Sequence, residues 1–132
     1  MTISDELTFR VNEVGVGSWN IDGIWRRING YRYNKLNDPF VLDQITRDKI
    51  FCISETHHIA SEEGLLHIPD YKCFSICRPK DKNVRRHKAS GGLAAYVHTS
   101  IRPGVAKVPL PGTEILVLKL KKHFFGLDND IF

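Results

Sequence analysis

Two apolar runs that each end on a polar residue constrain the fold of this chain more than any other feature. Residues 14–21 and 50–54 have the character of short strands; the first reaches Asn20 and the second is followed by Glu55. Between them Asp38-Pro39 is a typical helix start, with the Asp as N-cap and the proline at the first helical position. Two strands joined through a helix usually lie parallel, so their carboxyl ends share one edge of the sheet. Asn20 and Glu55 are therefore predicted to meet at the edge where open α/β folds place ligands.

The remaining residues are assigned from periodicity and turn signals. Residues 22–37 mix glycine, asparagine, arginine and aromatic residues and are predicted to form a loop. The helix that starts at Pro39 is expected to end near residues 47–49, and Ser61 is placed as the cap of a short helical turn. Further strands are predicted at 71–77, 93–98 and 113–120, with the start of one more at 131–132. Residues 1–13 are taken as a leader, and residues 14–132 as part of one domain.

Composition narrows the class of protein. A chain of 132 residues with 42% apolar and 26% charged residues is typical of one soluble globular domain. No apolar run approaches the ~20 residues that span a bilayer, and the polar, acidic N-terminus lacks the apolar region of a signal peptide. We therefore expect no membrane partner. Three cysteines, an odd number, argue against a disulfide framework and for an intracellular, reducing compartment.

The positive charge is concentrated in residues 78–88. This run holds six Lys or Arg residues and one Asp, a net +5, whereas the whole chain carries +4. The basic residues are Arg78, Lys80, Lys82, Arg85, Arg86 and Lys88. We predict an exposed loop between two antiparallel strands. A solvated surface is the plainer interpretation, but a nucleic-acid backbone would be attracted to such a loop, and we favour this second interpretation.

Asn20 and Glu55 are the candidate site residues. A carboxylate directly after a buried strand is costly unless a cation balances it, so Glu55 is predicted to bind a metal rather than an arginine. Asn20 alone would be interpreted as a buried strand-end amide, but its predicted position beside Glu55 favours a role in the site. Carboxylate and amide oxygens suit a hard cation, Mg²⁺ or Mn²⁺, together with a phosphate.

Other polar and aromatic residues have weaker signals. His57 and His58 lack the further His or Cys pair that a zinc site requires, so one is predicted to pack and the other to face water. Cys73 and Cys77, four residues apart, share one strand face and are assigned to core packing. An aromatic and arginine-rich segment is equally consistent with nucleic-acid stacking and with ordinary packing. Its residues are Trp25, Arg26, Arg27, Tyr31, Arg32 and Tyr33.

Three sequence blocks carry a family resemblance. They are Ser-Trp-Asn-Ile-Asp-Gly at 18–23, Ser-Glu-Thr-His at 54–57 and Ser-Gly-Gly-Leu-Ala-Ala-Tyr-Val at 90–97. In order and spacing they resemble the endonuclease/exonuclease/phosphatase superfamily, which includes DNase I, and are most similar to endonuclease domains of LINE-type retrotransposons. The resemblance implies an α/β fold, a partial four-layer α/β sandwich whose mixed sheet has a helix crossover between its first two strands. It also implies that Asn20 helps hold the phosphate and metal, and that Glu55 is a metal ligand.

The function implied is that of a metal-dependent phosphodiester hydrolase, a DNA endonuclease of retrotransposon type that uses Mg²⁺ or Mn²⁺. A nuclear location and a reverse transcriptase region in the full-length protein go with that assignment. The family continues beyond the third block with an Asp-x-Asn and a Ser-Asp-His motif, and neither is found after residue 97. The 132 residues match the family's N-terminal half, so we expect this fragment to be inactive by itself. The alternatives are a non-catalytic nucleic-acid-binding remnant and a small-molecule phosphatase of the same superfamily.

Overall fold

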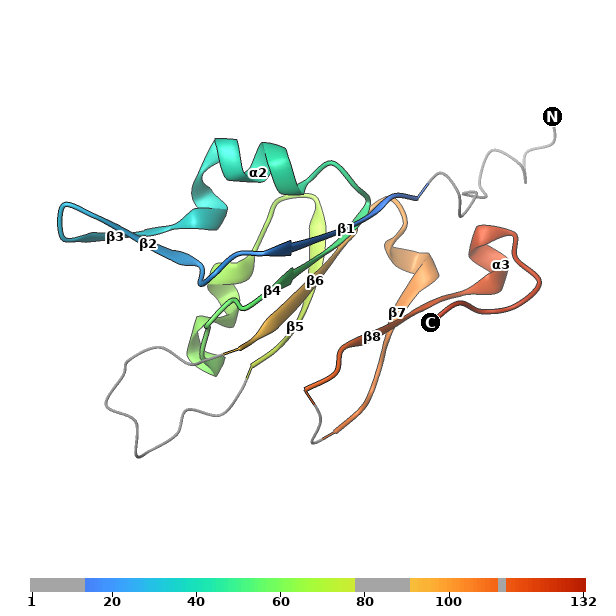
Figure 1. Ribbon diagram of the computed structural model, residues 1–132. Coiled ribbons are helices and arrows are strands. Elements are labelled where there is room, and N and C mark those ends of the chain that lie inside the picture. The colour runs from blue at the N-terminus through green and yellow to red at the C-terminus, as the bar shows by residue number, and fades with distance from the viewer. Residues whose placement is uncertain (1–13, 78–90, 112–113) are drawn as a thin grey trace.

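A four-stranded mixed sheet forms the centre of the molecule (Figure 1). The structure is a computed structural model that describes residues 14–77, 91–111 and 114–132. Strand β1 (Val16–Asn20) pairs parallel with β4 (Ile50–Ser54), as predicted for two strands linked through a helix. Strand β6 (Leu93–His98) pairs antiparallel with both β4 and β5 (Tyr71–Ile76), which gives the order β1-β4-β6-β5. The predicted α/β class and the antiparallel pairing of β5 with β6 are confirmed.

Helix α2 (Pro39–Ile45) begins where its capping residues predict. The Asp38 carboxylate accepts a 2.9 Å hydrogen bond from the Phe40 N–H, which satisfies one free donor of the first turn. The helix ends at Ile45, earlier than expected, with Thr46 at its C-cap. The Thr46 side chain donates a 2.6 Å bond to the Leu42 carbonyl and so satisfies one of the last acceptors.

The segment expected to be a loop contains a β-hairpin. Strand β2 (Trp25–Ile28) pairs antiparallel with β3 (Tyr31–Asn34), and the 3₁₀ turn η2 (Lys35–Asn37) follows. The hairpin turn is Asn29-Gly30, and both residues have positive φ, 50° and 81°. This is the geometry that Asn-Gly favours in two-residue hairpin turns. The hairpin projects away from the central sheet (Figure 1).

The 3₁₀ turn η3 (Ala60–Leu66) lies between β4 and β5. Its N-cap residue is Ile59, so the prediction that Ser61 caps the turn is wrong. The Ile59 N–H donates a 3.1 Å hydrogen bond to the Glu62 carboxylate. The Glu62 carboxylate thus accepts from the N–H of the N-cap residue, and Ile59 has no side-chain oxygen with which to cap the turn.

The C-terminal residues form a second hairpin, whose first strand was not predicted. The 3₁₀ turn η4 (Arg102–Gly104) leads into β7 (Val105–Val108), which pairs with β8 (Val117–Leu120). The strand expected from residue 113 is shorter because β7 offers only four partners before Pro109, which has no N–H to donate. Helix α3 (Lys122–Phe125) follows, and Leu120 then bridges to Ile131, where a further strand was expected to start.

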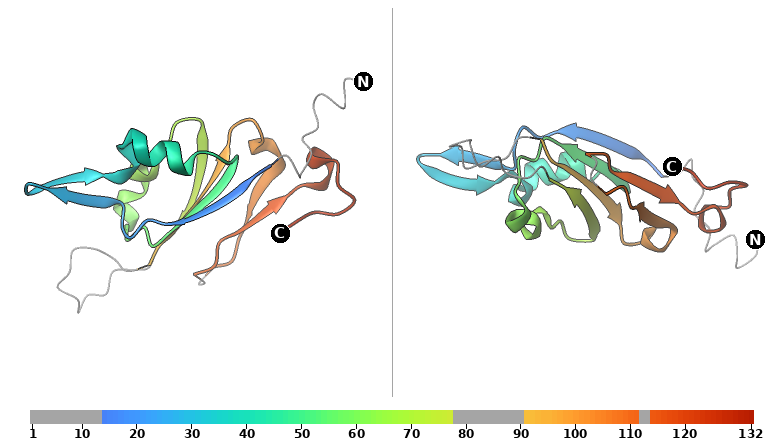
Figure 2. Two further views of the ribbon diagram at one scale, coloured as in Figure 1. Left: turned by 45° about the horizontal axis from the view of Figure 1, so that its top comes forward. Right: turned by 90° about the horizontal axis from the view of Figure 1, so that it is seen from below.

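The two faces of the sheet are covered differently (Figures 1 and 2). Helix α2 and the turn η3 cover one face, where Phe51 and Tyr96 pack in the larger buried cluster. The β7–β8 hairpin and α3 cover the other face, where Val97 and Phe125 are buried. Successive strand residues point to opposite faces, so the neighbours Tyr96 and Val97 belong to different clusters. Among the described residues, no helix combines the length and apolar character needed to cross a bilayer.

Candidate metal centre at the sheet edge

The strand pairing places Asn20 and Glu55 at the same edge of the sheet. Asn20 is opposite Ser54 in the β1–β4 register, and Glu55 follows Ser54 directly. The predicted neighbourhood in the backbone is therefore confirmed. The Asn20 side chain is exposed, which excludes its interpretation as a buried amide, and its Oδ1 accepts a 3.0 Å hydrogen bond from the Asp22 N–H. Asn20 thus shapes the turn that carries Asp22.

Glu55 has two polar neighbours that were not predicted from the sequence. A carboxylate oxygen of Asp22, one of Glu55 and a ring nitrogen of His57 lie within 4.8 Å of one another. The Glu55 Oε2 is 4.0 Å from the His57 Nε2. Asp22 lies two positions after Asn20, and His57 lies two positions after Glu55. This spacing could have identified Asp22 and His57 as site residues from the sequence. The arrangement gathers two acidic oxygens and one nitrogen at the carboxyl ends of two parallel strands.

The backbone of this edge has a strained conformation. Asp22, Glu55 and His57 all have positive φ, 50°, 53° and 55°. This conformation costs a non-glycine residue about 1–2 kcal/mol, and such residues concentrate at functional sites. Two backbone hydrogen bonds hold the loops together: Gly23 N–H donates to the Glu55 carbonyl at 2.7 Å, and Ile24 N–H donates to the Thr56 carbonyl at 3.1 Å.

The exposed fractions of the Glu55 and His57 side chains differ from those predicted. The Glu55 side chain is 52% exposed, so the prediction that its burial demands a cation is wrong. The His57 side chain is only 15% exposed, although one histidine of the pair was expected to face water. Its Nδ1 is buried and has no hydrogen-bond partner among the described residues. His58 is fully buried, as expected for the packed member of the pair.

A pocket of about 230 Å³ opens beside Glu55. Its walls come from the ends of β4 and β5, the start of β6 and the segment before β8. The polar side chains that line it include Glu55, Cys77 and Glu114, and Gly91 and Gly92 contribute backbone. The candidate metal centre is therefore accessible from a concave surface.

The aromatic and arginine side chains of the β2–β3 hairpin fall into two groups. The Trp25 Nε1 donates a 3.0 Å hydrogen bond to Glu62, and the Arg32 guanidinium lies 4.0 Å from the centre of the Trp25 ring. Trp25 is partly buried, whereas the Arg32 side chain is 50% exposed and lies 3.7 Å from the Glu62 carboxylate. Tyr31 and Tyr33 are 69% and 51% exposed. Arg26 and Arg27 are exposed on the same hairpin.

The basic run from Arg78 to Lys88 lies outside the described residues.

Comparison of the chain with protein-family models, with curated proteins and with solved structures gives no match. Function is therefore inferred from the chemistry of the chain's own residues.

Proposed function

We propose that this protein belongs to the metal-dependent phosphodiester hydrolases and acts on DNA. One observation carries the proposal: the carboxylates of Asp22 and Glu55 converge with the His57 imidazole beside Asn20, at the carboxyl ends of β1 and β4. Ligands bind at this edge in open α/β sheets. All four residues lie in two of the three sequence blocks that resemble the endonuclease/exonuclease/phosphatase superfamily, the blocks at 18–23 and 54–57.

The donor set suits Mg²⁺ or Mn²⁺. Asp22 and Glu55 offer carboxylate oxygens, the ligands that Mg²⁺ prefers. When bound, such an ion stabilises negative charge on phosphoryl and leaving-group oxygens. Glu55 and Asp22 would hold the ion, and Asn20 would keep the Asp22 turn in place by accepting the bond from the Asp22 N–H. The His57 Nε2, 4.0 Å from the Glu55 Oε2, would help to orient that carboxylate.

DNA is the proposed substrate class because two basic regions favour a long polyanion over a small phosphate ester. Tyr31 and Tyr33 are exposed on a projecting hairpin beside Arg26 and Arg27, an arrangement suited to stacking and backbone contact. The run at 78–88 adds a net charge of +5. The finer assignments belong to the same proposal: a partial DNase I-like sandwich, a LINE-type endonuclease, a nuclear location, and a reverse transcriptase region in the full-length protein.

Replacing Glu55 with alanine is expected to weaken Mn²⁺ binding at the sheet edge. Glu55 supplies one of the two carboxylates, and a Mg²⁺-type ion held by one carboxylate keeps most of its water. Mn²⁺ binding is measured by electron paramagnetic resonance of the free ion and by paramagnetic broadening of backbone amide signals at 20–23 and 54–57. We expect at least about tenfold weaker binding, with no broadening at these residues.

The matched control is Asp43→Ala, which removes an exposed carboxylate from α2. It should leave Mn²⁺ affinity and the broadening pattern unchanged. Mn²⁺ binding that is equally strong in the Glu55→Ala variant would contradict the proposed centre. Nicking of supercoiled plasmid in the same samples tests hydrolysis. We expect none from these 132 residues alone; Glu55-dependent nicking would contradict that expectation and would also exclude the non-catalytic remnant.

Replacing Arg85, Arg86 and Lys88 with alanine should weaken duplex DNA binding and flatten its salt dependence. Removing one phosphate neutralisation lowers the slope of log K against log salt by about 0.9, so removing all three lowers it by roughly 2.7. Fluorescence anisotropy over a salt series measures both quantities. The control removes the same charge elsewhere, with Arg47, Lys72 and Lys107 replaced by alanine. If the two variants had equal slopes of log K against log salt, the run at 78–88 would not contact the DNA backbone specifically.

A further inference from the structure

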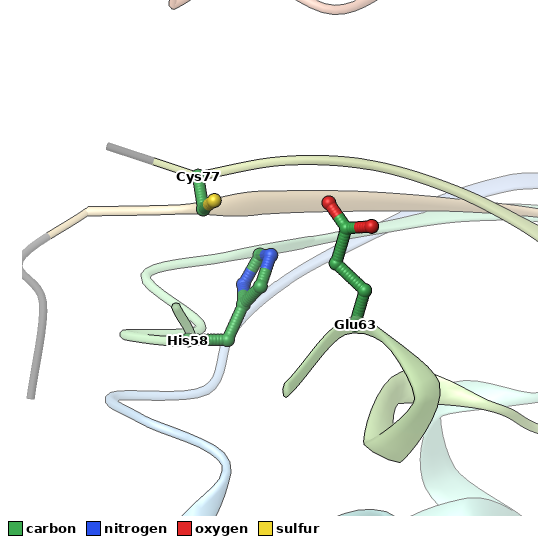
Figure 3. A group of neighbouring side chains, drawn as sticks. All are labelled: His58, Glu63 and Cys77. Carbon is green, nitrogen blue, oxygen red and sulfur yellow. The ribbon is translucent and has the colours of Figure 1, made fainter. Parts of the chain in front are cut away.

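A second group of metal-ligand side chains lies apart from Asp22 and Glu55. The side chains of His58, Glu63 and Cys77 place a ring nitrogen, a carboxylate oxygen and the sulfur within 4.8 Å of one another. They come from the segment after β4, from η3 and from the end of β5. Figure 3 shows the three side chains directed toward a shared space. Zinc was not predicted from the sequence because no histidine or cysteine pair has suitable spacing, but the strand order brings Cys77 to His58.

An unsatisfied ring nitrogen of His58 is the main indication that this group binds a ligand. Its side chain is fully buried, yet its Nε2 has no hydrogen-bond partner among the described residues. An unsatisfied buried polar atom costs about 1–3 kcal/mol, so it requires an explanation. Burial lowers the pKa of His58, while the charges of Glu63 and Glu62 oppose that shift. Burial thus favours the neutral imidazole, which is the form that binds metals.

The other ring nitrogen of His58 has the partner that a metal-binding histidine usually has. Its Nδ1 is 2.5 Å from the hydroxyl oxygen of Thr56, which is also fully buried. In the tautomer that carries its proton on Nδ1, the ring would donate to Thr56 Oγ1 and leave the lone pair of Nε2 free to bind an ion. Such outer hydrogen bonds fix the tautomer and orientation of the ring in metal sites. The imidazole is therefore oriented before any ion arrives.

We propose that His58, Glu63 and Cys77 form a binding site for a borderline-soft transition metal ion, best matched by Zn²⁺. Nitrogen, thiolate and carboxylate are all zinc ligands, and three protein ligands leave a fourth, open position for water. In tetrahedral zinc with bonds of about 2.0–2.3 Å the ligand atoms lie about 3.3–3.8 Å apart, so these three atoms, now within 4.8 Å of one another, would move closer on binding. The thiolate discriminates against Mg²⁺, which prefers oxygen. The site would fasten η3 to the end of β5.

Co²⁺ is the probe that tests this site, because its absorption reports both geometry and ligands. The full 132-residue chain, kept reduced, is titrated with Co²⁺ and then with Zn²⁺. We expect one equivalent of tetrahedral Co²⁺ with a thiolate-to-metal charge-transfer band, and its displacement by Zn²⁺. Cys77→Ser should remove the charge-transfer band. His58→Gln should weaken binding at least about 100-fold, and Thr56→Val by roughly 10–100-fold.

Two control variants separate this site from its neighbours. Cys52→Ser removes a different half-buried thiol and should leave the spectrum unchanged. Glu55→Ala removes the proposed Mg²⁺ ligand and should also leave it unchanged, so the two proposals can fail independently. Absence of the charge-transfer band, or a band that survives Cys77→Ser, would overturn the proposal. So would Co²⁺ binding that disappears in Glu55→Ala, since the ion would then bind at the other centre. Far-ultraviolet circular dichroism checks that each variant is folded.

Discussion

Replacing Phe51 with alanine is expected to lower the free energy of unfolding by about 3–5 kcal/mol. Phe51 is fully buried in β4, and its ring centre lies 4.8 Å from that of Tyr96 in a stacked arrangement and 4.9 Å from that of Tyr71. Alanine would bury less area and leave a cavity between two aromatic rings. Urea unfolding followed by circular dichroism measures the change. The decrease is a large part of the about 5–15 kcal/mol that stabilises a typical domain.

The matched control is Phe40→Ala, the same chemical change at a side chain that is 73% exposed on α2. It should shift stability by no more than about 0.5 kcal/mol. An equal decrease in both variants would mean that Phe51 does not occupy the core. Tyr96→Phe tests the same cluster through a hydrogen bond instead of a cavity. It removes the hydroxyl that donates a 2.7 Å hydrogen bond to the Leu66 carbonyl.

Replacing Gly92 with alanine should destabilise the protein by about 2–5 kcal/mol, from backbone strain and steric overlap together. Gly92 has a φ of 91°, which L residues rarely adopt. An added Cβ would overlap the Thr56 hydroxyl oxygen and lie 3.2 Å from the His58 Nδ1. The change would therefore displace the pair that orients His58. Urea unfolding measures the decrease in stability, and the Co²⁺ spectrum should weaken in parallel.

Gly64→Ala provides the comparison, because no atom lies within 4 Å of the Cβ it would add. Its stability should stay within about 0.5 kcal/mol of the parent protein. If Gly92→Ala were equally harmless, the close packing of Gly92 against Thr56 would be wrong.

The parallel β1–β4 pair was predictable because its signals are local. The apolar runs mark the strands, and Asp38-Pro39 marks the helix between them, so topology follows from a general rule about crossovers. The hairpin at residues 25–34 was missed although Asn29-Gly30 signals such a turn. Its strands are mostly exposed and carry arginines, and so they lack the apolar alternation that predicts a half-buried strand.

The candidate sites were less predictable because they depend on contacts between distant segments. Asn20 and Glu55 could be paired from strand direction alone. The closeness of Cys77 to His58 depends on sheet order: β5 pairs with β6 rather than directly with β4. No spacing along the chain encodes that order. The expected burial of Glu55 was wrong because a residue one position beyond a buried strand can already turn toward solvent.

The segment from Glu55 to His58 serves both proposed metal centres. Glu55 and His57 belong to one centre, while Thr56 and His58 belong to the other. The Thr56 and His57 N–H groups donate to the carbonyls of Gly92 and Gly91 at 3.3 and 2.8 Å, so the middle of this segment is held against the Gly91–Gly92 backbone. An ion that draws His58 toward Cys77 therefore acts on the same short peptide that positions Glu55. If the two ions bind, their free energies of binding are linked, and thermodynamic reciprocity requires zinc to alter magnesium affinity by the same factor as magnesium alters zinc affinity.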